Sequence, residues 1–159
     1  MKKTLLALAL LGASSTAIAD SWIYGGASIG RSDFEGKSGT SYSVHAGTGI
    51  LPIIGLEGGY VNHGDFDIGA VEYSPSSFYF AVKPSFDFGP LHVYAKGGIH
   101  AWDIDANGGK SDDGVDVMYG VGAEYFIMGP LSVGASYMNY TMDSRDVSTI
   151  SFNATLHFL

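Results

Sequence analysis

The chain has 159 residues, of which 16 are acidic and 8 are basic, and its formal net charge at pH 7 is −8. This acidic balance argues against nucleic acid as a partner, because phosphate recognition requires basic patches. The absence of cysteine excludes disulfide bonds and thiolate metal sites. The mean hydropathy is mildly positive although charged residues are scarce, which leaves a single folded domain, either a soluble β-barrel or a membrane-embedded one.

The first residues have the pattern of a secretory signal peptide. Two lysines follow Met1, an apolar run extends from Leu5 to Leu11, and the small-residue sequence Ala17-Ile18-Ala19 precedes Asp20. The apolar run is too short to cross a bilayer as a helix, for which about 20 residues are needed. We therefore expect residues 1–19 to be a cleaved signal peptide that exports the chain, and residues 20–159 to form the mature domain.

Proline-containing turn signals divide the mature chain at nearly equal spacing, at Leu51-Pro52-Ile53, Gly89-Pro90-Leu91 and Gly129-Pro130-Leu131. Longer polar stretches alternate with these turns, at residues 33–40, 62–77, 103–114 and 141–146. Tight turns at one end and longer loops at the other are typical of outer-membrane barrels, whose short turns face the periplasm. The pattern predicts an up-and-down meander of eight strands, at residues 22–31, 42–50, 53–61, 78–88, 91–102, 115–126, 131–140 and 148–158.

Side chains in these predicted strands alternate between apolar and polar. In the last strand the apolar positions are Ile150, Phe152, Ala154, Leu156 and Phe158, and the residues between them are Ser151, Asn153, Thr155 and His157. A membrane barrel is apolar outside and polar inside, which is the inverse of a soluble barrel. The alternation alone also fits a β-sandwich whose polar face meets water.

Aromatic residues favour the membrane barrel over the sandwich. They fall on the apolar face towards the strand ends, where aromatic girdles lie in membrane barrels, at Tyr60, Phe78, Phe86, Tyr119, Tyr125, Tyr137 and Phe158. A soluble protein would expose too many of them. The sequence therefore predicts an all-β fold, a closed eight-stranded antiparallel up-and-down transmembrane β-barrel.

Several short motifs resemble the eight-stranded transmembrane domain of outer membrane protein A and its small relatives. They are Trp22-Ile23-Tyr24-Gly25-Gly26-Ala27-Ser28-Ile29-Gly30, Gly55-Leu56-Glu57-Gly58-Gly59-Tyr60, Tyr94-Ala95-Lys96-Gly97-Gly98 and Gly122-Ala123-Glu124-Tyr125. The resemblance covers the mature chain. It implies a protein that crosses the cell outer membrane several times, without the periplasmic domain of the two-domain members.

The last strand is similar to the assembly signal that the outer-membrane insertion machinery reads. Ser151, Asn153, Leu156 and Phe158 occupy its positions, with Asn in place of a glycine and Leu in place of an aromatic residue. The alternative is an ordinary amphipathic strand. The resemblance implies as partners the insertion machinery, periplasmic chaperones, outer-membrane lipid and lipopolysaccharide, and we expect a monomer that binds no nucleic acid.

Four charged residues are predicted to point into the lumen at one level. Glu57, Lys83, Lys96 and Glu124 each lie a few residues from a tight turn. Because an unpaired buried charge is strongly destabilising, we expect Glu57 to pair with Lys83 and Lys96 with Glu124, forming a plug. In the resembling family such a cluster plugs or gates the lumen. Gly134 stands near the position of that family's arginine, which favours a static plug.

A weak calcium motif begins at Asp103. With Asp105 and Asn107 this residue has the spacing of the first ligands of a calcium loop, but Gly114 stands where the bidentate glutamate is required. We favour an acidic surface loop and predict neither a metal nor a cofactor. Histidines are predicted in the lumen, with packing favoured over metal binding, at His45, His92, His100 and His157, and His63 is placed in a loop.

The function that these features predict is structural or surface-exposed, with adhesion as one form of it. A narrow ion-conducting pore is the first alternative. A lipid A-modifying enzyme is the second, and it would need a serine, a histidine and an acid within reach of one another. Ser43 and His45 are two residues apart, but they are predicted to face the lumen with no acid tied to them, so we do not expect an enzyme.

Overall fold

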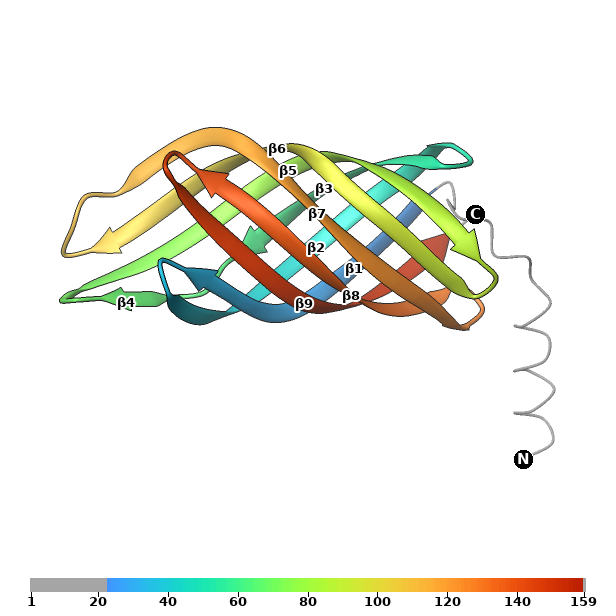
Figure 1. Ribbon diagram of the computed structural model, residues 1–159, viewed down its shortest axis with the longest axis horizontal. Helices are drawn as coiled ribbons and strands as arrows, with labels where there is room; N and C mark the ends of the chain where they lie inside the picture. Colours follow the sequence, from blue (N-terminus) through green and yellow to red (C-terminus); the bar gives the residue numbers. More distant parts are fainter. Residues whose placement is uncertain (1–22, 159) are drawn as a thin grey trace, which may run out of the picture.

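The computed structural model describes residues 23–158, so the predicted signal peptide lies outside the described residues. Eight long antiparallel strands close into a barrel (Figure 1). The strands are β1 (Ile23–Phe34), β2 (Lys37–Leu51), β3 (Ile54–Asn62), β4 (Phe66–Ile68), β5 (Val71–Phe88), β6 (Leu91–Asn107), β7 (Asp112–Met128), β8 (Leu131–Met142) and β9 (Arg145–Phe158). None of residues 23–158 forms a helix long and apolar enough to cross a membrane.

The barrel closes where β1 pairs with β9. Their register is continuous from Ile23 opposite Phe158 to Phe34 opposite Val147. Closure satisfies the backbone hydrogen bonds between strands, which is the condition for a sheet to lie in lipid. The prediction of a closed eight-stranded antiparallel barrel is confirmed, and the short strand β4, which the sequence did not predict, is added beside β5.

The two ends of the barrel differ. At the turn end, short connections that contain Pro52, Pro90 and Pro130 join the strands. At the extended end, β5, β6 and β7 reach 18, 17 and 17 residues, which exceeds the 9–11 or so that a tilted membrane strand needs. They project as a β-sheet wall beyond the neighbouring hairpins, towards the left in Figure 1.

The prediction of long polar loops at residues 33–40, 62–77, 103–114 and 141–146 was therefore wrong. Most of these residues continue the strands, and tight turns connect them at positions such as Glu35, Gly36 and Asp143, which adopt positive φ. The physical reason is that polar residues outside a bilayer can still pair as strands. Alternation continues there, with Trp102 and Ile104 buried and Asp103 exposed.

The outer surface is an apolar belt. Phe78 is 67% exposed and Phe152 is 70% exposed, although both are large and apolar. The aromatic residues assigned to the outer face in the sequence are exposed there, except that Tyr60 is partly covered by Phe78, with their ring centroids 4.8 Å apart. Exposed apolar side chains outside and buried polar ones inside confirm the orientation expected of a membrane barrel.

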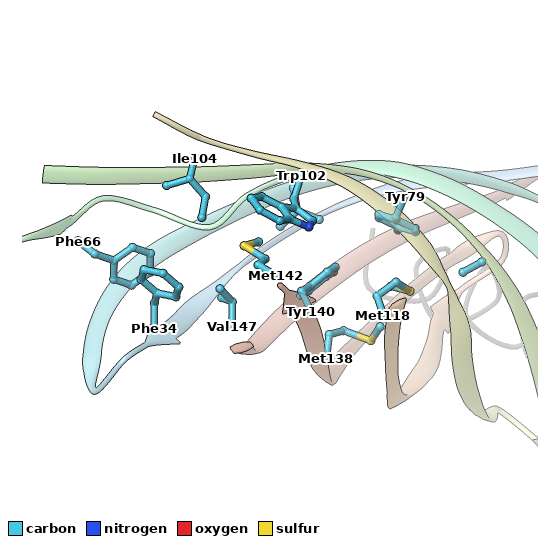
Figure 2. Packing of buried hydrophobic residues seen from close by; sticks show 12 residues of the cluster. Phe34, Phe66, Tyr79, Trp102, Ile104, Met118, Met138, Tyr140, Met142 and Val147 are labelled. Atoms are coloured by element: carbon cyan, nitrogen blue, oxygen red, sulfur yellow. The ribbon is translucent and has the colours of Figure 1, made fainter. Parts of the chain in front are cut away.

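Apolar side chains fill the lumen at the extended end (Figure 2). We call this group the apolar cap, and it comprises Phe34, Phe66, Trp102, Ile104, Tyr140, Met142 and Val147. The rings of Phe34 and Phe66 lie 5.5 Å apart. The lumen is therefore apolar at its extended end and polar towards its turn end.

Candidate functional site in the lumen

The centre of the polar lumen is the carboxylate of Glu57 on β3, which is almost completely buried. Its Oε1 accepts hydrogen bonds from Tyr79 Oη at 2.6 Å and from Lys96 Nζ at 2.5 Å. Its Oε2 accepts a hydrogen bond from Tyr24 Oη at 3.1 Å and lies 3.8 Å from Lys83 Nζ. Two tyrosine hydroxyls and two lysine ammonium groups, from the three strands β1, β5 and β6, thus surround one carboxylate, which is how a buried charge is stabilised.

The ammonium groups of Lys83 and Lys96 contact the rings of tyrosines. Lys83 Nζ lies 4.5 Å from the ring centroid of Tyr24 and 4.3 Å from that of Tyr94. Lys96 Nζ lies 5.1 Å from the Tyr94 centroid. Cation–π attraction strengthens when the groups are desolvated, so these tyrosines stabilise charges that the lumen would otherwise destabilise.

Glu124 on β7 forms a separate network nearer the turn end. Its carboxylate accepts hydrogen bonds from Ser132 Oγ at 3.2 Å, Asn153 Nδ2 at 2.7 Å and Thr155 Oγ1 at 3.2 Å. His157 Nε2 lies 3.6 Å from Glu124 Oε2. All four of these partners come from β8 and β9, on the side of the lumen away from Glu57.

The predicted contact between Lys96 and Glu124 is replaced by the contact between Lys96 and Glu57. The strand register gives the reason, because Lys96 lies opposite Gly120 on β7, whereas Glu124 lies further along the same strand, opposite His92. The long lysine side chain instead reaches past β5 to the carboxylate on β3. Sequence position could place both residues in the lumen, but it could not fix which partner a flexible side chain selects.

The space left in the middle of the lumen is small. A cavity of about 30 Å³ lies beside Lys96, and most of its lining is polar, including Ser41, Ser43, His45 and Asn153. A cavity needs about 10–15 Å³ to hold one water, so this space accommodates only a few water molecules. It is a pocket for solvent inside a packed lumen.

The family profile described as "Outer membrane protein beta-barrel domain" matches residues 4–158. The chain belongs to this family. No curated protein sequence matches the chain.

Three solved structures are similar to it across most of its length. Neisserial surface protein A has a TM-score of 0.67 at 15% identity, over 86% of this chain and 96% of the other. The N-terminal barrel of Pseudomonas aeruginosa OprF has a TM-score of 0.65 at 13% identity, over 87% and 99%. Yersinia pestis Ail, solved with the heparin analogue sucrose octasulfate, has a TM-score of 0.61 at 17% identity, over 87% and 98%. At these identities the likeness shows the fold alone.

The candidate assembly residues lie on both faces of β9. Ser151 and Asn153 are buried in the lumen, whereas Leu156 and Phe158 are exposed on the apolar belt. Ser151 Oγ lies 2.9 Å from Ser136 Oγ, within hydrogen-bond distance. The alternation needed for the signal is present in the folded outer-membrane barrel, and its recognition by the insertion machinery stays a prediction.

The calcium candidate is not a loop in the structure. Asp103, Asp105 and Asn107 follow one another on the outer face of β6, and Asp103 lies directly opposite Asp113. An extended strand separates alternate side chains instead of folding them around one ion. Within residues 23–158, no group of three or more histidine, cysteine, aspartate or glutamate side chains could hold a metal ion.

Calcium is accordingly expected to leave the thermal unfolding of this outer-membrane barrel unchanged. The measurement is the unfolding midpoint in detergent micelles at increasing calcium concentration, with potassium chloride added to match the ionic strength. The variant Asp103→Asn is the control, because it removes a candidate ligand. A calcium-dependent rise in the midpoint that disappears in this variant would restore the metal site.

The serine and histidine considered for an enzyme do not bond to each other. Ser43 Oγ is hydrogen-bonded with Ser28 Oγ, and His45 Nε2 lies 3.3 Å from Thr155 Oγ1. Sequence reasoning missed a different group, in which Ser132 Oγ lies 2.9 Å from His157 Nε2 and 3.2 Å from Glu124 Oε2.

This second group does not have the order of a catalytic triad. The same nitrogen of His157 faces both Ser132 and Glu124, whereas a triad histidine uses one nitrogen for the serine and the other for the acid. Ser132 is also fully buried. The arrangement supports packing of the lumen near the turn end, and the absence of enzymatic activity stays a prediction.

Proposed function

We propose that this outer-membrane barrel is a closed scaffold that presents its extended end at the cell surface, with a lumen plugged by the ion pairs around Glu57. The observation that carries the proposal is the complete set of partners on that carboxylate, two lysines and two tyrosines within 3.8 Å. Such a network needs tight packing, and a cavity of about 30 Å³ lies beside it. A hydrated ion would have to displace these contacts in order to pass.

Gly134 supports a static plug over a switching one. This residue pairs with Glu124 across β7 and β8. A Cβ atom at Gly134 would collide with the carbonyl oxygen of Ala123 and approach Glu124. A cationic side chain therefore has no space at this position. No cation from this site on β8 can compete with the two lysines for the carboxylate of Glu57.

The charge of the extended end bears on a surface role. It carries twelve acidic side chains, namely Asp33, Glu35, Asp65, Asp67, Glu72, Asp103, Asp105, Asp112, Asp113, Asp116, Asp143 and Asp146, against four basic ones, Arg31, Lys37, Lys110 and Arg145. Ail was solved with a heparin analogue, which is strongly anionic. Like charges repel, so we do not extend that ligand class to this chain, and an adhesive role here requires a neutral or cationic partner surface.

The plug predicts that the wild-type barrel shows no resolved conductance steps in a planar lipid bilayer. The triple variant with Glu57→Ala, Lys83→Ala and Lys96→Ala removes the charges together with much of their volume, and we expect it to conduct. Single-channel recording in about 1 M potassium chloride measures both. This salt concentration gives a Debye length of about 3 Å, so that surface charge contributes little.

Lys110→Ala is the matched control, because Lys110 lies in the hairpin between β6 and β7, far from the lumen network. Heat-modifiability on a gel verifies that each variant is folded before recording. Steps in the wild type that persist unchanged in the triple variant would favour the narrow pore and contradict the plug.

A further inference from the structure

His63 is held rigidly at the extended end of the lumen. It lies between β3 and β4, and its backbone N–H donates to the carbonyl of Pro75 at 2.9 Å. Gly64 follows with φ +94°, a conformation that favours glycine, and its N–H donates to Asn62 Oδ1 at 2.9 Å. This tight segment places the imidazole of His63 fully inside the barrel.

A carbonyl group fixes the protonation of a histidine pair. His100 Nε2 lies 2.8 Å from the Thr141 carbonyl oxygen, so this nitrogen must carry the hydrogen that is donated. In the neutral ring, His100 Nδ1 is then an acceptor, and Ser77 Oγ, at 3.0 Å, donates to it. The same Ser77 Oγ lies 3.0 Å from His63 Nε2 and accepts its hydrogen. This assignment leaves His63 Nδ1 unprotonated.

The surroundings disfavour a positive charge on His63. His63 Nδ1 is buried without a hydrogen-bond partner among residues 23–158. The ring of Tyr140 covers both histidines, with centroids 4.7 Å from His63 and 5.3 Å from His100. No carboxylate of the described chain lies within 4.0 Å of either histidine as an ion-pair partner.

Asp116 acts electrostatically on His100, but it and Asp65 already accept hydrogen bonds from other groups. Asp116 on β7 accepts hydrogen bonds from Trp102 Nε1 at 2.9 Å and from the N–H of Asp143 at 2.8 Å. Asp65, in the same segment as His63, accepts a hydrogen bond from Ser74 Oγ at 2.6 Å. Burial, with a smaller contribution from the neighbouring His100, lowers the pKa of His63 from 6.5 to about 3. The closed arrangement therefore requires a neutral His63.

We propose that this histidine pair makes the extended end acid-sensitive, so that protonation releases the segment of residues 63–68 and admits water to the apolar cap. The connection is direct in the chain, because Phe66 of this segment packs against Phe34 in the cap (Figure 2). The network around Glu57 lies deeper in the lumen and contains neither His63 nor His100. Acid should thus open a pocket at the surface without opening the barrel.

The direction with pH follows from linkage. The pKa of His63 is lower in the closed state than in an exposed state, so the exposed state binds the proton first. The closed cap is fully stable above about pH 6.5 and loses stability as the pH falls from there towards 3. With one proton taken up, the equilibrium constant for opening rises about fivefold over the first pH unit below 6.5 and approaches a tenfold rise per unit in the middle of this window.

Cysteine accessibility tests the proposal in the full-length folded protein, which contains no native cysteine. Val147→Cys places a thiol in the apolar cap, and Ser111→Cys places one on the exposed hairpin between β6 and β7. The ratio of their modification rates by a polar methanethiosulfonate cancels the ordinary effect of pH on thiolate. Between pH 6.5 and 5.5 we expect the ratio to rise about fivefold, and to stay flat when His63→Gln and His100→Gln are added.

Two outcomes would overturn the proposal, a ratio that does not change with pH and a rise that is identical in the glutamine variant. If that variant does not fold, the imidazole resonances of the wild-type protein in micelles decide. If the imidazole of His63 titrates near pH 6.5 while the resonances of the cap residues stay unchanged, acid opening is contradicted. If the imidazole and the cap resonances change over the same pH range, acid opening is supported. Bilayer conductance should remain unchanged by acid, which separates this inference from the plug.

Discussion

Replacing Glu57 by alanine is expected to destabilise the barrel by about 3–5 kcal/mol, because the substitution leaves Lys83 and Lys96 buried without their carboxylate. Both lysines lie in the low-dielectric lumen, and the aromatic rings around them replace only part of the lost attraction. The two tyrosines that donate to Glu57 would lose their acceptor as well.

Equilibrium unfolding by urea in detergent micelles measures this effect, with heat-modifiability on a gel as an independent probe of the closed barrel. Glu72→Ala is the matched control, because Glu72 is an exposed acidic residue on β5 near the extended end, and it should change stability by no more than about 0.5 kcal/mol. Glu57→Gln should fall between the two, since the amide can accept hydrogen bonds but cannot neutralise a lysine.

A second substitution makes the result specific to charge. Adding Lys96→Met to Glu57→Ala removes one of the two uncompensated cations and is expected to recover part of the lost stability. Equal stability of Glu57→Ala and the Glu72 control would show that water reaches the lysines freely, and the plug would then be wrong. Additive losses in the double variant would show that the two residues act independently.

The barrel could be predicted because membrane strands reverse the usual pattern along their whole length. Ile150 and Phe152 alternate with Ser151 and Asn153 in a strand that has lipid on one side and a polar lumen on the other. The period of two then assigns the face of every residue once one strand is oriented. The same period of two predicts that Glu57, Lys83, Lys96 and Glu124 point into the lumen, where the structure has them.

Alternation does not show how far along the barrel axis a residue lies or how far its side chain extends. Lys96 and Glu124 share the lumen, but the register of β6 and β7 offsets them, and a long side chain can select a partner beyond the adjacent strand. The polar stretches concealed strands for a related reason, since turn-forming residues and exposed strand residues have similar composition. Isolated apolar residues such as Phe34 and Phe66 were the available signal for the apolar cap.

The sequence also does not show where the backbones of two strands approach each other closely. The neighbouring glycines Gly97 and Gly98 on β6 provide a test. A Cβ atom built on Gly98 would collide with the carbonyl oxygen of Phe80 and lie 2.6 Å from the Cα of Ala81, both backbone atoms of β5. Backbone cannot move aside as a side chain can. Gly98→Ala is therefore expected to cost about 3 kcal/mol or more, the upper end of overpacking, or to prevent barrel closure.

Gly97 points the other way, onto the apolar belt, and a Cβ atom there meets nothing within 4 Å. Gly97→Ala should leave the urea midpoint unchanged or raise it slightly, because alanine loses less conformational entropy on folding than glycine. Refolding yield and the urea midpoint of both variants in the same micelles provide the comparison. Since the two substitutions add the same methyl group at adjacent positions of one strand, strand propensity cancels. The two methyl groups enter different surroundings, but this contributes only about 0.8 kcal/mol, so a larger difference between the variants reports the inward steric constraint. Equal stability would mean that β5 and β6 can move apart at Gly98, and the steric constraint inferred from the built Cβ atom would be wrong.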